Sequence, residues 1–455
     1  MAHRFMRRAW FCAAIIGVLA GFSAYGAAQR AAPSALPARA SSVVVFPFEN
    51  IGHAAQLDWL GEGLSELTIE RLAGHGLSLF SREDRLDALE KLGLPAYARF
   101  SRATMLKIAA EIDADYVIFG EFSAESGALR VTARVLRVTP PALAEPIPES
   151  GALDSLPQIQ ARFAWQALCE IQSSLSQDSS CRAASGDQQQ FVDAVRPLLP
   201  DAFELYIRGL LNADDDIRLR NLREAARLQP DWDEPPLALA RTYYAKRDCE
   251  AALQWFGRVS TQGPHAAEAD FDSGVCDLLR NDPVHAESAF SAISGATQAD
   301  NARDSAVAQN RGADEPAVAS NLGAALLRQA RYKEAVADFE RALRLDPGEP
   351  DYEFNEGLAQ YLAGDWTEAS RALREALRFQ PDDAQTKALL IAALDRAGES
   401  GEANALRSEG RPASASEAAK DAAPAPPRRD VTKLDPTALA RLARIRTAFV
   451  QGAAR

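Results

Sequence analysis

The sequence predicts a small α+β domain followed by an all-α solenoid of helical repeats. Two observations carry this prediction. Between residues 42 and 175, short apolar or alternating runs typical of strands are interspersed with amphipathic runs typical of helices. Between residues 200 and 397, small and aromatic residues recur every 34 positions, as they do in stacked helix pairs. A chain of 455 residues, 47% of them hydrophobic, has enough apolar material for both parts.

Charge and cysteine content exclude two classes of protein. The formal net charge is −13, which argues against nucleic-acid binding, because phosphate affinity comes mainly from Lys and Arg. Five Cys in 455 residues are too few for a disulfide scaffold.

The first 28 residues are typical of a secretory signal peptide. Three Arg residues precede an apolar run over residues 9–24, and small residues follow. We expect cleavage near Ala28, then a linker over residues 29–41, and export to the periplasm or the outer membrane. An uncleaved inner-membrane anchor is the alternative.

Export leaves four cysteines in an oxidising compartment, namely Cys169, Cys181, Cys249 and Cys276. Cys249 and Cys276 fall on neighbouring helices of the repeat register, which favours a disulfide between them. Buried free thiols are the alternative interpretation.

The α+β domain is expected over residues 42–175. Its predicted strands are residues 43–48, 77–80, 116–122 and 129–138. Its predicted helices are residues 60–72, 84–92, 101–112 and 156–175, the last of which trails the sheet. After the hairpin, Pro146 and Pro148 permit only an edge strand.

Five segments of this domain carry a family resemblance: VVVFPFEN, WLGEGLSELTIERL, SREDRLDAL, IAAEIDADYVIFGEFS and LRVTARVLRV. Together they resemble the TolB amino-terminal-like domain and the related FlgO and CsgG families. The family motif falls on Pro47, Phe48, Asn50, Gly61, Gly63, Glu66 and Gly120. The resemblance implies a non-enzymatic role in the bacterial envelope. The chain departs from the family pattern after Val138, where a Pro-rich segment replaces a full strand.

The same motif does not form a phosphate-binding loop. The pair Gly61 and Gly63 is not followed by a third Gly at the required spacing, and Glu62 would repel phosphate. Glu62 and Glu66 lie one helical turn apart, which favours a solvated helix face over an acid–base pair.

The 34-residue repeat is the strongest signal in the chain. Gly323, Ala335, Phe339, Ala342 and Pro347 recur as Gly357, Ala369, Leu373, Ala376 and Pro381. This pattern resembles the tetratricopeptide repeat family, which implies a superhelix with a concave groove. A linker is expected over residues 176–199, a flexible insertion near 295–315, and a capping helix over residues 387–394.

First helices of the repeats should line the groove, at Ser320, Asn321, Arg328, Phe354, Asn355 and Tyr361. Asn321 and Asn355 occupy the same repeat position, where the family's side chains can hydrogen-bond a peptide backbone. The alternative, that they only cap or solvate the helix, remains open. The preceding unit has Asp272 at this position.

The carboxyl-terminal part divides in two. Residues 398–430 are rich in Ala, Ser and Pro and predict a disordered linker. Residues 431–455 predict a basic amphipathic helix, with seven Lys or Arg against two Asp from Arg428 onward. Such a helix can dock on an anionic membrane or on the chain's own acidic solenoid.

Catalytic and cofactor motifs are missing. The chain has no GxxxxGK[ST], HExxH or GxSxG, and the spacing of Cys249, His265, Cys276 and His285 is not that of a zinc site. The sequence therefore predicts a non-enzymatic exported adaptor with a protein or peptide partner, without cofactor or metal. An oligomeric outer-membrane secretion or surface-structure component resembling FlgO or CsgG is the alternative.

Overall fold

The computed structural model describes residues 40–52, 54–73, 75–96, 98–125, 127–176, 185–194, 196–300 and 315–409. The predicted signal peptide, much of the predicted insertion and the predicted basic helix over residues 431–455 lie outside these ranges. None of the described helices is long and apolar enough to cross a membrane.

The amino-terminal domain contains a mixed sheet. Its strands are β1 (Ser41–Val45), β2 (Glu49–Asn50), β3 (Leu77–Leu79), β4 (Tyr116–Glu125), β5 (Ala128–Arg137), β6 (Ala142–Leu143) and β7 (Ile147–Ala152). β1 pairs in parallel with β3 and β4, and β2 pairs in parallel with β4. β4 and β5 form the predicted antiparallel hairpin. β6 and β7 both pair with β5 in antiparallel orientation.

β7 contains Pro148 of the Pro-rich segment, for which the sequence permits only an edge strand. It pairs with residues 128–133 of β5 and has no other strand partner among the described residues. Pro148 lacks an N–H and is tolerated there because only one side of the strand is paired. The predicted edge strand is therefore confirmed.

Helices cover both faces of the sheet because β1 is apolar on both faces. Val43 and Val45 pack with α2 (Trp59–Leu72) and α5 (Leu156–Ser176). Val44 packs with the helices α3 (Arg82–Lys91) and α4 (Arg102–Glu111). Ser81 starts α3 with a capping box, in which its Oγ accepts from Asp84 N and its N–H donates to Asp84 Oδ2.

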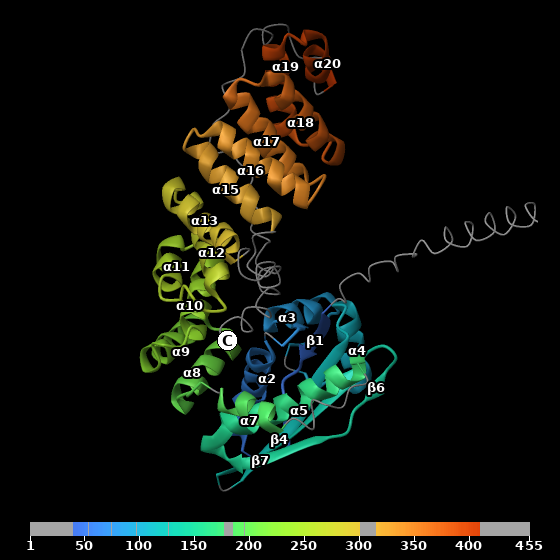
Figure 1. Cartoon of the computed structure of the whole chain (residues 1–455), viewed down its shortest axis with the longest axis vertical. Coiled ribbons are helices and arrows are strands. Elements are labelled where there is room, and N and C mark those ends of the chain that lie inside the picture. Colours follow the sequence, from blue (N-terminus) through green and yellow to red (C-terminus); the bar gives the residue numbers. More distant parts are fainter. Residues whose placement is uncertain are drawn as a thin grey trace, which may run out of the picture. The chain divides into compact units, whose positions relative to one another are not determined.

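The rest of the described chain is helical, and Figure 1 shows successive antiparallel pairs. The helices are α7 (Ser185–Asp193), α8 (Pro200–Leu211), α9 (Asp215–Leu228), α10 (Glu234–Ala245), α11 (Cys249–Phe256), α12 (Ala266–Leu279), α13 (Pro283–Asp300), α15 (Pro316–Arg328), α16 (Tyr332–Leu345), α17 (Pro350–Ala363), α18 (Trp366–Phe379), α19 (Ala384–Ala397) and α20 (Ser400–Glu409).

Within a repeat, a glycine lets the two helices approach. A Cβ at Gly323 on α15 would lie 2.8 Å from the ring of Phe339 on α16, which is fully buried. Gly357 and Leu373 repeat this contact in the next unit. The recurring Gly of each unit therefore stands where a side chain would clash with the partner helix.

Two segments differ from the predicted linkers. α7 lies within residues 176–199, where its Phe191 packs against Trp165 at a ring separation of 5.3 Å. α20 lies within residues 398–430 and packs on α19 through Ala403, which is fully buried. Each segment is too polar to predict a helix alone, and apolar contacts to neighbouring elements anchor it.

The first repeat helices share one hydrophobic core with the sheet domain. Phe203 of α8, Leu222 of α9 and Leu239 of α10 belong to the same buried cluster as Val43 and Phe163. Trp59 of α2 contacts Phe203 edge-on at 5.7 Å. This shared core holds the elements that line the site described next.

Candidate functional site

Two glycines of the amino-terminal motif, Gly61 and Gly120, pack against Phe48. The Phe48 N–H donates to Gly61 O (3.0 Å), and a Cβ at Gly61 would lie 2.3 Å from Phe48 O. A Cβ at Gly120 would lie 2.4 Å from the Phe48 ring. With Pro47 and Asn50, these residues line a cavity of about 760 Å³. The two glycines are therefore required for close packing.

Asn50 holds the loop that leads into α2. Its Nδ2 donates to Asp58 Oδ1 (2.7 Å) and to Ala54 O (3.1 Å), while its Oδ1 accepts from Gly52 N (3.0 Å). Gly63, the remaining glycine of the motif, faces Phe203 of α8. These contacts give both motif residues a structural role.

Glu62 forms a buried ion cluster with two arginines of α3. Its carboxylate bonds Arg85 Nη2 and lies 3.3 Å from Arg82 Nε, and all three residues are buried. Arg85 also donates to Val45 O (2.6 Å) and Ser65 Oγ (3.1 Å). The predicted solvated face is wrong at Glu62, because α3 supplies counterions that the sequence of α2 does not reveal.

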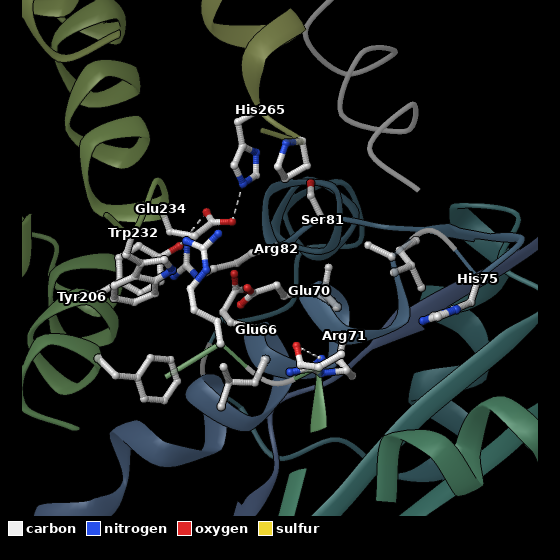
Figure 2. Close-up of a pocket in the computed structure, with 18 of the residues that line it drawn as sticks. Glu66, Glu70, Arg71, His75, Ser81, Arg82, Tyr206, Trp232, Glu234 and His265 are labelled. Atoms are coloured by element: carbon white, nitrogen blue, oxygen red, sulfur yellow. Dashed lines mark hydrogen bonds and ion pairs between the residues drawn. The ribbon is translucent and has the colours of Figure 1, made fainter. Parts of the chain in front are cut away.

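Glu66 faces a different cavity, which we call the α2 pocket. This pocket has a volume of about 670 Å³ and is lined from α2, α3, α5, α7, α8 and α10 and by His265, which precedes α12. Figure 2 shows the side chains of Glu66 and Glu70, one turn apart on α2, with Glu234 and His265 beside the same cavity. Trp232 and Tyr206 form part of its apolar wall.

Burial and like charge raise the pKa of the glutamates on α2. The pKa of Glu66 rises from its usual 4.5 to about 8, first through desolvation and then through Glu62 and Glu83, with Arg85 opposing. The pKa of Glu70 is also raised, chiefly by desolvation, with Arg71 opposing. Both carboxyl groups are therefore costly to ionise in the folded chain.

The opposite wall of the pocket is a hydrogen-bonded chain. His265 Nε2 lies 2.7 Å from Glu234 Oε1, and Tyr206 Oη donates to Glu234 Oε2 at 3.4 Å. Arg241 Nε donates to Glu268 Oε1 at 2.5 Å. His265 Nδ1 is buried without a hydrogen-bond partner.

Replacing Glu66 by glutamine should flatten the pH dependence of stability between pH 5 and pH 8. With its raised pKa, Glu66 keeps its proton in the folded state at pH values where the unfolded chain has lost it. The stability that this proton contributes is complete below pH 4.5 and is lost as pH rises through about 8. One proton accounts for at most about 1.4 kcal/mol per pH unit.

Urea denaturation at pH 5, 6, 7 and 8 measures this effect. Glu90→Gln, at an exposed position of α3, serves as the control and should keep the wild-type slope. A Glu66→Gln variant with an unchanged slope would show that another group titrates.

The predicted groove residues lie on the first helices α15 and α17. Asn355 Nδ2 lies 3.5 Å from Ser320 Oγ, so the two successive repeats meet at these side chains. Asn321, Asn355, Ser320 and Phe354 are fully buried, so an incoming peptide would have to replace contacts that they already make.

The other two groove residues, Arg328 and Tyr361, are partly buried. Arg328 donates to Leu278 O, and Tyr361 packs at the edge of the repeat core. Peptide binding by all six residues stays a prediction.

The structure contradicts the disulfide expected between two cysteines of the repeats. Cys249 and Cys276 are buried free thiols, so the favoured disulfide is wrong and the alternative is confirmed. Burial and the neighbouring Cys249 raise the pKa of the Cys276 thiol. Cys169 is disulfide-bonded. Within the described ranges, no three His, Cys, Asp or Glu residues are grouped to hold a metal ion.

Sequence reasoning missed most of the α2 pocket. Glu66 was singled out as part of the motif, and His265 only as a rejected zinc ligand, whereas Glu70 and Glu234 were not named. The spacing of Glu66 and Glu70 by one helical turn was the available signal for the first pair. The other two come from helices far along the chain, so their proximity to α2 depends on the tertiary fold.

Three stretches of the chain, residues 237–301, 294–350 and 320–384, match the family model of the tetratricopeptide repeat. The chain therefore contains tetratricopeptide repeats, as the 34-residue period predicted. No curated protein matches the chain.

Several solved structures are similar to parts of the chain at low identity. YrrB, titled a TPR protein with an unusual peptide-binding site, is 17% identical, with 41% of this chain and 90% of YrrB covered and a TM-score of 0.34. PilW, a type IV pilus biogenesis factor, is 20% identical over 46% of this chain and 88% of its own, with a TM-score of 0.34. The LpoB carboxyl-terminal domain from Salmonella enterica is 17% identical over 25% and 84%, with a TM-score of 0.22.

Proposed function

We propose that this chain is an exported, non-enzymatic scaffold that binds a protein or peptide partner in the bacterial cell envelope. The observation that carries the proposal is the stack of tetratricopeptide helix pairs, whose first helices α15 and α17 carry Asn321 and Asn355 at equivalent positions. An asparagine side chain offers both a donor and an acceptor, which suits the backbone of an extended peptide.

Two features of the sequence support the envelope location. The first 28 residues have the composition of a signal peptide, and residues 42–175 resemble the TolB amino-terminal-like and FlgO families. Fractionation followed by amino-terminal sequencing of the purified protein tests this part. We expect periplasmic or outer-membrane material that begins near residue 29, whereas full-length cytoplasmic protein would contradict export.

Affinity purification from an envelope extract with mass spectrometry tests partner binding. We expect a partner that wild type retains and that Asn321→Ala/Asn355→Ala loses. Asn404→Ala, at an exposed position of α20, is the matched control and should retain the partner. Circular dichroism should show equal helix content in all three proteins, since unfolding would also abolish binding.

Two other results would redirect the proposal. If the double variant retains the partner as well as wild type does, the groove is not the site that binds the partner. Recovery of the protein alone in many copies would instead favour the oligomeric outer-membrane component, and light scattering would give the copy number.

A further inference from the structure

The α2 pocket contains hydrogen-bond acceptors that lack donors. Glu66 Oε1 is buried and has no hydrogen-bond partner. His265 is only 6% exposed, and when its Nε2 carries the proton that Glu234 accepts, its Nδ1 is a second unpaired acceptor. Each buried polar atom without a partner costs about 1–3 kcal/mol. A ligand that brings donors would remove this cost.

Of the four described arginines that line the pocket, two pair with carboxylates outside it. Arg82 pairs with Glu62, and Arg241 pairs with Glu268. Arg196 donates to Asp231 O (2.9 Å), and Arg71 lies over the ring of Phe191 at 5.6 Å.

The two glutamates of α2 that line the pocket have no ion-pair partner among the described residues, and neither do Arg71 and Arg196. Neither Glu66 nor Glu70 forms an ion pair with any residue in the part of the chain that the structure describes. Within the described ranges, five acidic side chains line the pocket, and Arg71 and Arg196 are its arginines that are not paired with a carboxylate outside it, so acidic groups are in excess there.

The walls of the pocket suit an apolar body. Tyr206 and Trp232 pack with a ring separation of 4.8 Å, and Phe203 lies 6.1 Å from Trp232. All three line the cavity together with Leu67. Aromatic faces accommodate alkyl chains and attract cations, and a volume of about 670 Å³ is in the range of small-molecule sites.

We propose that the α2 pocket binds an organic cation with several N–H donors on an apolar body, its charged end between Glu66 and Glu70. An alkylammonium has this chemistry, and so does a basic side chain of an amphipathic peptide. The cation has two possible sources: a separate molecule, or the chain's own basic residues 431–455. The proposal does not depend on a peptide in the groove.

Binding should release a proton. Glu66 is surrounded by Glu62 on its own helix, Glu83 and Arg85 from α3, and Glu234 from α10. A bound cation would offset the repulsion from the glutamates and favour the ionised carboxylate of Glu66. Affinity for the cation should therefore rise between pH 6 and pH 8.

Isothermal titration calorimetry on the full chain tests the proposal with n-octylammonium. Octanoate, an eight-carbon amphiphile of opposite charge, serves as the comparison. We expect n-octylammonium to bind and octanoate not to bind. Affinity for n-octylammonium should fall at least tenfold in Glu66→Gln/Glu70→Gln and stay unchanged in Glu90→Gln. Titrations in buffers of different ionisation enthalpy measure the released proton.

Equal binding of octanoate, or unchanged affinity in a folded Glu66→Gln/Glu70→Gln variant, would overturn the proposal. A third variant identifies the source of the cation. If residues 431–455 occupy the pocket, Arg441→Gln/Arg444→Gln/Arg446→Gln should bind n-octylammonium more tightly than wild type. Equal affinity of this variant and wild type would support the same site with a cation from outside the chain.

Discussion

Replacing Glu62 by alanine is expected to lower the free energy of unfolding by about 3–5 kcal/mol. The substitution leaves the guanidinium of Arg85, a residue only 2% exposed, without its carboxylate. The two acceptors that remain, Val45 O and Ser65 Oγ, are neutral and do not balance the charge. Urea denaturation followed by circular dichroism measures the loss.

A double-variant cycle separates the ion pair from simple loss of packing. Glu62→Leu alone leaves Arg85 without its carboxylate, and Arg85→Met alone leaves Glu62 buried near Arg82. Glu62→Leu/Arg85→Met removes both charges of the pair. The double variant should lose less stability than the sum of the single variants. Glu90→Ala at the exposed end of α3 should change stability by less than about 0.5 kcal/mol. A loss of under about 1 kcal/mol in Glu62→Ala would contradict the buried pair.

Replacing Phe339 by alanine is expected to cost about 3–5 kcal/mol in the unfolding of the repeats. The ring is fully buried between α15 and α16, where a Cβ at Gly323 would lie 2.8 Å from it. Gly323 has no side chain to fill the space, so the cavity would persist. Thermal unfolding monitored at the helical band measures the effect.

Phe379→Ala is the matched control for this prediction. It makes the same chemical change in the neighbouring unit, at a side chain that is 55% exposed. Its cost should stay below about 1 kcal/mol, because little apolar surface leaves the interior. Equal losses in the two variants would mean that the ring of Phe339 is not packed as described.

The sequence predicted the elements whose signals are local. The alternating run of β5 and the continuous apolar run of β1 each depend on neighbouring residues. The 34-residue period of the solenoid is found by comparing the sequence with itself. α7 and α20 were not predicted, because each segment is mostly polar and is held by apolar contacts to other helices.

The site was predicted less well, for a similar reason. Glu62 and Glu66 are adjacent on one helix, yet one meets Arg85 of α3 and the other faces the α2 pocket. Helical spacing shows that two side chains lie close together, but what they face depends on helices that arrive later in the chain. The free thiols of Cys249 and Cys276 show the same limit, because the repeat register favoured a disulfide between them and both thiols are free.

The core shared by the sheet domain and the first repeat helices has a consequence for how the chain can be divided. A fragment ending at residue 175 would keep Leu60 and Phe163 but lose Phe203, Leu222 and Leu239, which cover the same cluster. Its exposed apolar surface would favour aggregation. The smallest autonomous unit of the amino-terminal half therefore extends through α10, so a gene fusion or a limited-proteolysis core should retain residues up to about 245.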